Sequence, residues 1–373
     1  MADSYVDYTR RNYGTATVVF DGYQDGPSTK DSTHQRRQQT NHPLVSVTPG
    51  AVFNYKKDDF LSKGSNKQAL IDIISTRLRE NGCNVVNCAG DADTEIVHMT
   101  IEASKYGSTT LIGEDTDLFV LLLYHMKPEQ KSVFFRSDNK SRRQINVYNI
   151  NKLKILLGPV LCSHLLFIHA FTGCDTTSRV FGVGKKPFFQ KFVHGDKDIE
   201  SCAVCFTSPG QTYAKVEECG NKAMVLLFGG KPTDSLATLR CNILKKKVVS
   251  ATCFVTPERL PPTESATKFH ARRCYYQIMT WLGKETDLDA EDWGWKCENN
   301  QYHPVMSDKS PAPDSLLKIV HCNCTTACTS RRCTCRGYGL SCTSACGKYQ
   351  TENCESPFNP SQLANSDLDD SDD

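Results

Sequence analysis

Residues 90–123 read GDADTEIVHMTIEASKYGSTTLIGEDTDLFVLLL, and this stretch decides the fold. It opens with acids that precede an apolar periodicity, which is typical of a helix with negative charge in its first turn. The short run 109–113 is β-branched and apolar, which predicts a buried parallel strand. The acids Glu114, Asp115 and Asp117 follow that strand directly. The stretch therefore predicts an α/β domain with acids gathered at the ends of its elements.

Acids at the carboxyl end of a parallel strand lie where α/β sheets bind ligands. The two sets here are Asp91 with Asp93 and Asp115 with Asp117. They would repel each other unless a cation lies between them. Clusters of carboxylates suit Mg²⁺ or Mn²⁺, and two such ions about 3.5–4 Å apart commonly cut phosphodiesters. The alternative is structural, a capped helix followed by a solvated loop, in which acids are also common.

The length and composition of the chain limit the classes of protein to which it can belong. The chain has 373 residues, 39% hydrophobic and 23% charged, which is ordinary for two or three globular domains. Its net charge of +2 gives no global field for nucleic acid, so any such surface must be local. There is no run of about eighteen apolar residues and no apolar N-terminal core, so we expect no membrane span, signal peptide or membrane partner. Nineteen cysteines without a secretory signal indicate metal or free thiols rather than disulfides.

The N-terminal part adds a further acid and a basic segment. Residues 15–22, TATVVFDG, predict a buried strand that ends in Asp21. We expect the basic segment that follows to form a helix. Its cations are Lys30, Arg36 and Arg37. A phosphate backbone would need such a helix beside an acidic pocket, although a solvated helix face explains the same residues. Residues 41–65 are expected to form an irregular loop over the pocket, and 66–80 an amphipathic helix.

Two strands over 131–150 and helices over 151–157 and 160–171 are predicted next. The segment 167–193 then reads FIHAFTGCDTTSRVFGVGKKPFFQKFV. Its GVG allows close approach of the backbone, with N–H groups that can hold an anion at the start of the next helix. The two lysines that follow add positive charge. The expected DNA contacts of this segment are Gly182, Gly184, Lys185 and Lys186.

This order of motifs resembles the flap-endonuclease family, a branch of the PIN-like 5′ nucleases. The family's VFDG strand end, acidic helix start, SEDxD strand end and GCD segment before a helix–hairpin–helix match stretches of residues 15–195 in the same order. The resemblance implies a three-layer α/β fold with a mainly parallel sheet, a two-ion Mg²⁺ or Mn²⁺ site, and duplex DNA held by the hairpin. The residues at the metal positions are Asp21, Asp91, Asp93, Asp115, Asp117 and Asp175, of which all but Asp21 would be catalytic.

Two departures from the family bear on activity. The family carries a further aspartate on a strand before VFDG, and we expect that N-terminal strand to be missing here. Asp91 and Asp93 also stand where the family has glutamate, which withdraws each carboxylate by one methylene. An inactive nuclease fold that binds DNA is therefore the alternative to an enzyme, and a mobile-element product is a third interpretation.

Residues 322–354 hold eight cysteines in the spacing C-x-C-x3-C-x4-C-x-C-x6-C-x3-C-x7-C. The segment has too few apolar residues for a core, so thiolate-bound zinc would have to supply its folding energy. Between Leu317 and Gln350 the charged residues are basic only, which suits phosphate contact. The expected zinc ligands are Cys322, Cys324, Cys328, Cys333, Cys335, Cys342, Cys346 and Cys354.

Over residues 321–354 this segment resembles the tesmin-type CXC domain, a zinc-cluster module that binds DNA, although its closing cysteines are fewer. The resemblance implies two or three Zn²⁺ ions and contact with DNA through basic residues and a tyrosine. The expected DNA contacts are Arg331, Arg332, Arg336 and Tyr338.

We therefore predict four parts. They are a PIN-like nuclease domain at 1–195, a mainly helical extension at 196–310, a CXC zinc module at 311–356 and an acidic, disordered tail at 357–373. The predicted function is metal-dependent, structure-specific cleavage of nucleic acid, namely DNA, in the nucleus. The zinc module would be the targeting part.

Overall fold

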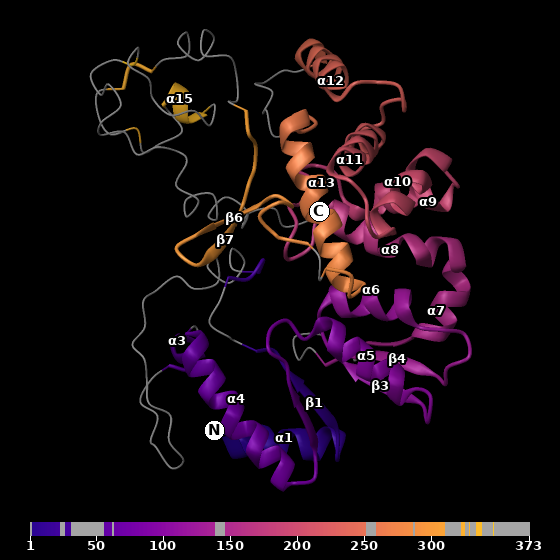
Figure 1. Cartoon of the computed structure of the whole chain (residues 1–373), viewed down its shortest axis with the longest axis vertical. Coiled ribbons are helices and arrows are strands. Elements are labelled where there is room, and N and C mark those ends of the chain that lie inside the picture. The colour runs from indigo at the N-terminus through magenta and orange to yellow at the C-terminus, as the bar shows by residue number, and fades with distance from the viewer. Residues whose placement is uncertain are drawn as a thin grey trace. The chain divides into compact units, whose positions relative to one another are not determined.

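A computed structural model describes residues 2–22, 27–30, 56–61, 63–138, 146–250, 259–285, 288–309, 322–324, 328, 333–337 and 346 (Figure 1). The described chain is mixed α/β, mostly helical with short strands. It divides into two compact units. The first comprises residues 1–234 and 270–304, and the second comprises 235–269 and 305–373. The aspartates predicted to bind metal all belong to the first unit, and the C-terminal cysteine cluster belongs to the second.

The first unit begins with two parallel strands joined through helices. β1 (Thr17–Phe20) pairs in parallel with β2 (Asn84–Asn87). Between them the chain forms α3 (Lys57–Leu61) and α4 (Gly64–Glu80), and α4 packs against α1 (Ala2–Tyr13). These helices and β2 share one buried apolar cluster, which consists of Val6, Phe60, Leu70, Ile74, Leu78, Cys83 and Val85. The cluster fixes β2 and thereby the point at which the acidic stretch begins.

A second sheet follows in the chain. β3 (Thr109–Ile112) pairs in parallel with β4 (Val133–Ser137), and β4 pairs in antiparallel fashion with β5 (Asn146–Asn149). α5 (Asp93–Ala103) leads from β2 to β3, and α6 (Thr116–His125) leads from β3 to β4. α5 and α6 pack against each other. The carboxyl ends of β2 and β3 therefore both lead into the amino ends of paired helices.

A bundle of helices completes the first unit's core. It contains α7 (Ile150–Leu157), α8 (Pro159–Thr172), α9 (Lys185–Val193), α10 (Lys197–Thr207) and α11 (Tyr213–Leu227). α8 is central, with eleven of its fourteen residues buried, and it packs against α6, α7, α9 and α10. Within the described ranges no single helix is long and apolar enough to cross a membrane. α7 and α8, bent by 100° at their junction, meet that test of length and composition only as a pair.

The remaining elements lie later in the chain. α12 (Leu236–Ser250) belongs to the second unit, and α13 (Glu264–Trp281) starts there and continues into the first. β6 (Trp295–Glu298) and β7 (Gln301–Pro304) form an antiparallel hairpin. The short helix α15 (Thr334–Gly337) lies within the cysteine cluster's sequence. The described residues between 196 and 285 are mainly helical.

The structure confirms the predicted helix at 66–80 and the parallel strand at 109–113, close to their predicted ends. The two strands within 131–150 are also present. The described strands form three small sheets, with two parallel and two antiparallel pairs, where the sequence predicts one mainly parallel sheet. Among the described residues, no hydrogen-bonded pairing joins β1 or β2 to the second sheet, so the two sheets are separate.

Two local predictions are wrong, and a third is only partly described. Lys30 lies in a turn, and the rest of the segment predicted to form a basic helix lies outside the described residues. Residues 57–61, within the stretch predicted to be irregular, form α3, whose Phe60 is buried in the apolar cluster. The strand predicted to be buried at 15–22 is half-exposed, because β1 pairs with β2 alone in the part of the chain described here. Arg36 and Arg37 lie outside the described residues.

One buried histidine of α13 makes stability depend on pH. His270 Nε2 lies 2.9 Å from the Phe171 carbonyl oxygen, to which it donates, and 3.5 Å from Cys274 Sγ. Burial, reinforced by the neighbouring Arg273 guanidinium, lowers the pKa of His270 from 6.5 to about 4. The unfolded chain therefore takes up a proton at higher pH than the folded chain, so stability is lost as the pH falls through this window.

We expect the uptake of a proton by His270 on unfolding to lower the free energy of unfolding by about 1.4 kcal/mol per pH unit as the pH falls from 6.5 towards 4. The total loss should be about 3 kcal/mol. Above pH 6.5 the histidine is neutral in both states and its contribution is complete. Urea unfolding at a series of pH values measures the slope. His270→Gln is the control, because its amide still donates to Phe171 but does not titrate. Parallel stability curves for the two proteins would show that the pKa is not lowered.

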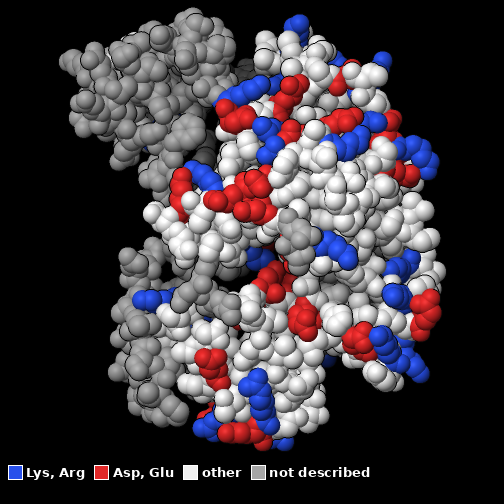
Figure 2. All heavy atoms as spheres, viewed as in Figure 1, with Lys and Arg blue, Asp and Glu red and all other residues white. Residues whose placement is uncertain are grey.

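Charge is mixed over the face of the molecule shown in Figure 2, with both signs interspersed. Acidic and basic side chains both occur in small groups at several places on this face.

Candidate metal sites

The ends of β1 and β2 lie side by side because the strands pair in parallel, and a backbone hydrogen bond joins the residues that follow them. The Gly22 N–H donates to the Gly90 carbonyl oxygen at 2.9 Å. A Cβ on Gly22 would lie 2.2 Å from the carbonyl oxygen of Ala89, so only glycine fits there. Asp21 Oδ1 then accepts the N–H of Ala92 at 3.0 Å, at the entrance to α5. Asp21 thus holds the start of the helix that carries the first acids.

Shortly after β3 the chain enters α6 through a helix cap. Asp115 has extended backbone angles and its side chain accepts the N–H of Asp117 at 2.9 Å, which makes it the N-cap of α6. Asp117 lies in the first turn of α6 and is only 6% exposed. The helix dipole favours both carboxylates at this end. The local sequence therefore places these two acids where the strand ends, as predicted.

A lysine lies between the acids at the start of α5. Lys30 Nζ lies 2.7 Å from Asp91 Oδ1 and 2.9 Å from Asp93 Oδ2. Burial, and then repulsion from Asp91, raises the pKa of Asp93 to about 7, although Lys30 opposes the shift. Burial lowers the pKa of Lys30, but attraction to Asp93 and Asp91 outweighs it and raises that pKa overall. The position between these carboxylates thus strongly favours a cation.

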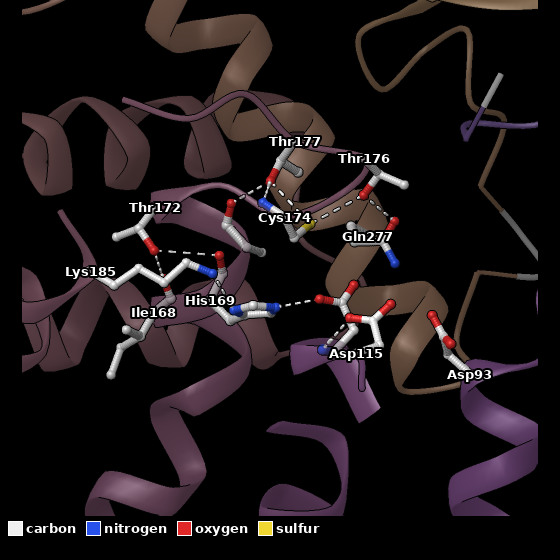
Figure 3. A network of polar contacts seen from close by, with 12 residues as sticks. Asp93, Asp115, Ile168, His169, Thr172, Cys174, Thr176, Thr177, Lys185 and Gln277 are labelled. Carbon is white, nitrogen blue, oxygen red and sulfur yellow. Dashed lines mark hydrogen bonds and ion pairs between the residues drawn. The ribbon is translucent and has the colours of Figure 1, made fainter. Parts of the chain in front are cut away.

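The second set of acids interacts with the first and with the loop after α8. Burial raises the pKa of Asp115, and repulsion from Asp117 and Asp175 adds to the shift. Asp115 in turn raises the pKa of Asp93. Figure 3 shows Asp93 and Asp115 pointing toward the same space from neighbouring helices. The structure therefore brings together the acids that the sequence predicts to be catalytic, with Lys30 among them.

The loop after α8 has a backbone that only glycine permits. Gly173 has φ 109°, and a Cβ there would lie 2.7 Å from Arg179 Cα. Thr177 fastens the loop, because its Oγ1 accepts the Cys174 N–H at 3.0 Å and donates to the Ala170 carbonyl oxygen at 2.6 Å. This fold of the loop presents Asp175 to the acids and leads the chain on toward α9.

α9 begins as predicted after the GVG segment. Gly182 has φ 73°, and Gly184 is the N-cap of α9, with no side chain capping the first turn. Lys185 and Lys186 are the first residues of the helix. Burial lowers the pKa of Lys185, an effect opposed by Cys174 and by the acid Asp117. Lys185 therefore lies near the acids as well as at the helix start.

His169 is a site residue that the sequence analysis does not single out. Its Nε2 lies 2.6 Å from Asp117 Oδ1, and its Nδ1 lies 2.7 Å from Lys185 Nζ. Figure 3 shows it between Lys185 and the carboxylates. The available signal is a polar residue within the apolar run of α8, which pattern alone cannot distinguish from a satisfied core histidine.

The carboxylates lie near one another, but their oxygen atoms do not surround a single ion position. In the described part of the chain, groups of three or more ligand atoms within 4.8 Å of one another occur among cysteines and not among these aspartates. Such spacing suits a cation that keeps several of its waters, as Mg²⁺ does, more than one held by protein atoms alone.

The C-terminal cysteines do form such groups. The Sγ atoms of Cys322, Cys324, Cys328 and Cys333 all lie within 4.8 Å of one another. Those of Cys322, Cys335 and Cys346 form a second group, so Cys322 belongs to both. These groups can hold a metal ion such as zinc, because thiolates are ligands that zinc prefers and four of them make its usual structural site.

The remaining predicted residues of this module are only partly visible. Arg336 Nη1 donates to the Cys328 carbonyl oxygen at 3.2 Å, so this predicted DNA contact also ties α15 to the cysteines. Five other predicted residues lie outside the described part of the chain. They are Arg331, Arg332, Tyr338, Cys342 and Cys354.

Comparison of the chain with protein-family models, curated proteins and solved structures found no match.

Proposed function

We propose that the chain is a divalent-metal-dependent nuclease that acts on branched or single-strand-ended DNA, built on a PIN-like core. The observation that carries the proposal is the meeting of acids from three separate places: the end of β2, the end of β3 and the loop after α8. An apolar core alone does not require carboxylates from three segments to converge. A site for a hard cation does.

The donor set fits Mg²⁺ or Mn²⁺, because it consists of carboxylate oxygens and a cation already lies among them. The residues that would hold the ions are Asp91, Asp93, Asp115, Asp117 and Asp175. A bound ion would supply a water of lowered pKa and would stabilise charge on the scissile phosphate. Asp21 would keep the first acids in place through the start of α5.

Cations of the chain would orient the nucleic acid. Lys30 lies against the acids and can turn from them to a phosphate that approaches the site. The uncapped first turn of α9, with Lys185 and Lys186, offers N–H groups and positive charge to a second phosphate. The cysteine module would add a separate basic contact, consistent with action on DNA in the nucleus.

The test is cleavage of a labelled 5′-flap DNA in the presence of Mn²⁺. We expect release of the flap, inhibition by a chelator, and weaker cleavage of the matching duplex without a flap. A flap made of RNA shows whether the sugar matters. If purified full-length protein binds the flap DNA and leaves it intact in both Mn²⁺ and Mg²⁺, the nuclease proposal fails.

One observation favours a second candidate, an inactive nuclease fold that binds DNA. Lys30 Nζ takes a position between Asp91 and Asp93 that an ion would otherwise occupy. In an inactive protein this lysine would be a permanent substitute for the metal. In an enzyme it would give way to the ion.

Lys30→Met discriminates between the two candidates. Removing the ammonium leaves the buried Asp93 and its neighbour Asp91 uncompensated, so we expect the free energy of unfolding to fall by about 2 kcal/mol in metal-free buffer. If the site binds metal, Mn²⁺ should restore the lost stability, because the ion now has no competitor. Urea unfolding with and without Mn²⁺ measures both effects. Lys105→Met is the control, since it breaks an exposed pair with Glu102 and should change little. A loss that Mn²⁺ cannot reverse would favour the inactive protein.

A further inference from the structure

A chain of short contacts runs from the start of α9 to the acids. Lys185 Nζ lies 2.7 Å from His169 Nδ1, and His169 Nε2 lies 2.6 Å from Asp117 Oδ1 (Figure 3). The side chains of His169 and Asp117 are 5% and 8% exposed. The three residues come from α9, α8 and α6, so the chain connects the segment expected to hold DNA with the carboxylate site.

The donors and acceptors in this chain fix the histidine tautomer. An ammonium group has donors only, so Nδ1 of His169 must accept from Lys185. Nε2 then carries the ring proton and donates it to Asp117. With both nitrogens engaged, a flip of the ring would break two hydrogen bonds at once.

Packing holds the ring in the same orientation. The ring of His169 stacks on that of Trp281, with centroids 5.8 Å apart and an interplanar angle of 24°. Trp281 is buried, and α8 is buried on nearly all sides. The ring therefore has little room to leave Asp117.

We propose that His169 is a positioning residue, which holds one oxygen of Asp117 and so turns the other toward the metal site. Lys185 supports it by occupying Nδ1. This inference rests on the metal-binding part of the proposed function, because it assumes that Asp117 binds a divalent ion, and it does not require cleavage. A metal ligand that is hydrogen-bonded to a residue outside the coordination shell is already oriented before the ion binds. Loss of such a partner lowers metal affinity by about ten- to a hundred-fold.

Two substitutions at His169 test the roles of its two ring nitrogens separately. The amide nitrogen of His169→Gln reaches roughly the place of Nε2 and can still donate to Asp117. The amide of His169→Asn reaches only the place of Nδ1 and leaves Asp117 without its donor. Titration of full-length, metal-free protein with Mn²⁺, followed by electron paramagnetic resonance, measures affinity without any need for cleavage. We expect His169→Asn to weaken Mn²⁺ binding about ten- to a hundred-fold, and His169→Gln to weaken it much less.

His164→Asn is the matched control. His164 lies on the same helix and is 6% exposed, but its ring packs against Phe192 and not against the acids. It should lose stability without loss of Mn²⁺ affinity. Equal losses of affinity in His164→Asn and His169→Asn, or in the Gln and Asn variants at 169, would overturn the inference.

Nitrogen-15 spectra of the wild type provide an independent readout. The His169 signals, identified by their absence in His169→Gln, should show a proton on Nε2 and none on Nδ1. A proton found on Nδ1 alone would overturn the inference, because Asp117 would then face an acceptor.

The outcomes distinguish this inference from the proposed function. If the wild type binds Mn²⁺ and cleaves DNA, and His169→Asn does both equally well, the inference fails and the function stands. If the wild type binds Mn²⁺ without cleaving, and His169→Asn binds it weakly, the function fails and the inference stands. A wild type that binds no Mn²⁺ overturns both.

Discussion

Asparagine in place of Asp115 is expected to lower the rate of Mn²⁺-dependent flap cleavage on the order of a thousand-fold, since even outer-shell partners of metal ligands cost ten- to a hundred-fold. Asparagine is as good an N-cap as aspartate, so it can still accept the Asp117 N–H and keep the start of α6. The variant therefore removes one charge from the acids and little else. Single-turnover cleavage measures the rate, and Mn²⁺ titration shows whether the loss lies in metal binding.

Asp196→Asn is the control for this experiment. Asp196 is the N-cap of α10, where it accepts from the N–H groups of Asp198 and Ile199 at 3.1 and 3.3 Å. It repeats the capping role of Asp115 in a helix that carries none of the predicted metal ligands. Its cleavage rate should stay near that of the wild type. If Asp115→Asn also cleaves at that rate, the end of β3 takes no part in the chemistry.

Serine in place of Cys322 is expected to empty the cysteine module of metal, whereas the same change at Cys324 should remove ligands from one group only. Cys322 belongs to both groups of Sγ atoms, so its loss leaves each of them one thiolate short. Structural zinc supplies on the order of 10 kcal/mol of folding free energy in small modules, so the module should unfold without it. Elemental analysis gives zinc per chain, and binding to duplex DNA reports the consequence.

Cys241→Ser is the matched control for the module. Cys241 is an exposed thiol of α12 and lies in the same compact unit as the module, outside both groups. Its zinc content and DNA affinity should equal those of the wild type. Zinc retention by Cys322→Ser at the level of Cys324→Ser would mean that the two groups do not share a ligand.

The acids were the part of the site that the sequence could predict. Their positions follow from short-range rules: an apolar run ends, a capping residue follows, and a helix begins. Asp115 shows this directly, since its side chain caps α6 immediately after β3. β2 and β3 belong to separate sheets among the described residues, so the meeting of their acids depends on the packing of α5 against α6 and not on a shared sheet edge.

The partners of the acids could not be predicted in the same way. Lys30 reaches Asp91 across 61 positions of sequence, from a turn that carries no periodic signal. His169 faces Asp117 only because α8 packs against α6. α1 has a single buried residue, Val6, so its apolar pattern was too weak to indicate a helix. Contacts of this kind depend on how elements pack, which the pattern along one element does not contain.

The burial of α8 has a consequence for the time scale of motion at the site. A helix enclosed by four others exchanges its amide hydrogens with solvent only when the whole unit opens, so α8 should be among the slowest segments to take up deuterium. His169 belongs to that slow segment, whereas Lys30 lies in a turn between separate elements. Any opening of the acidic site that leaves the first unit folded would therefore have to occur around a stationary α8.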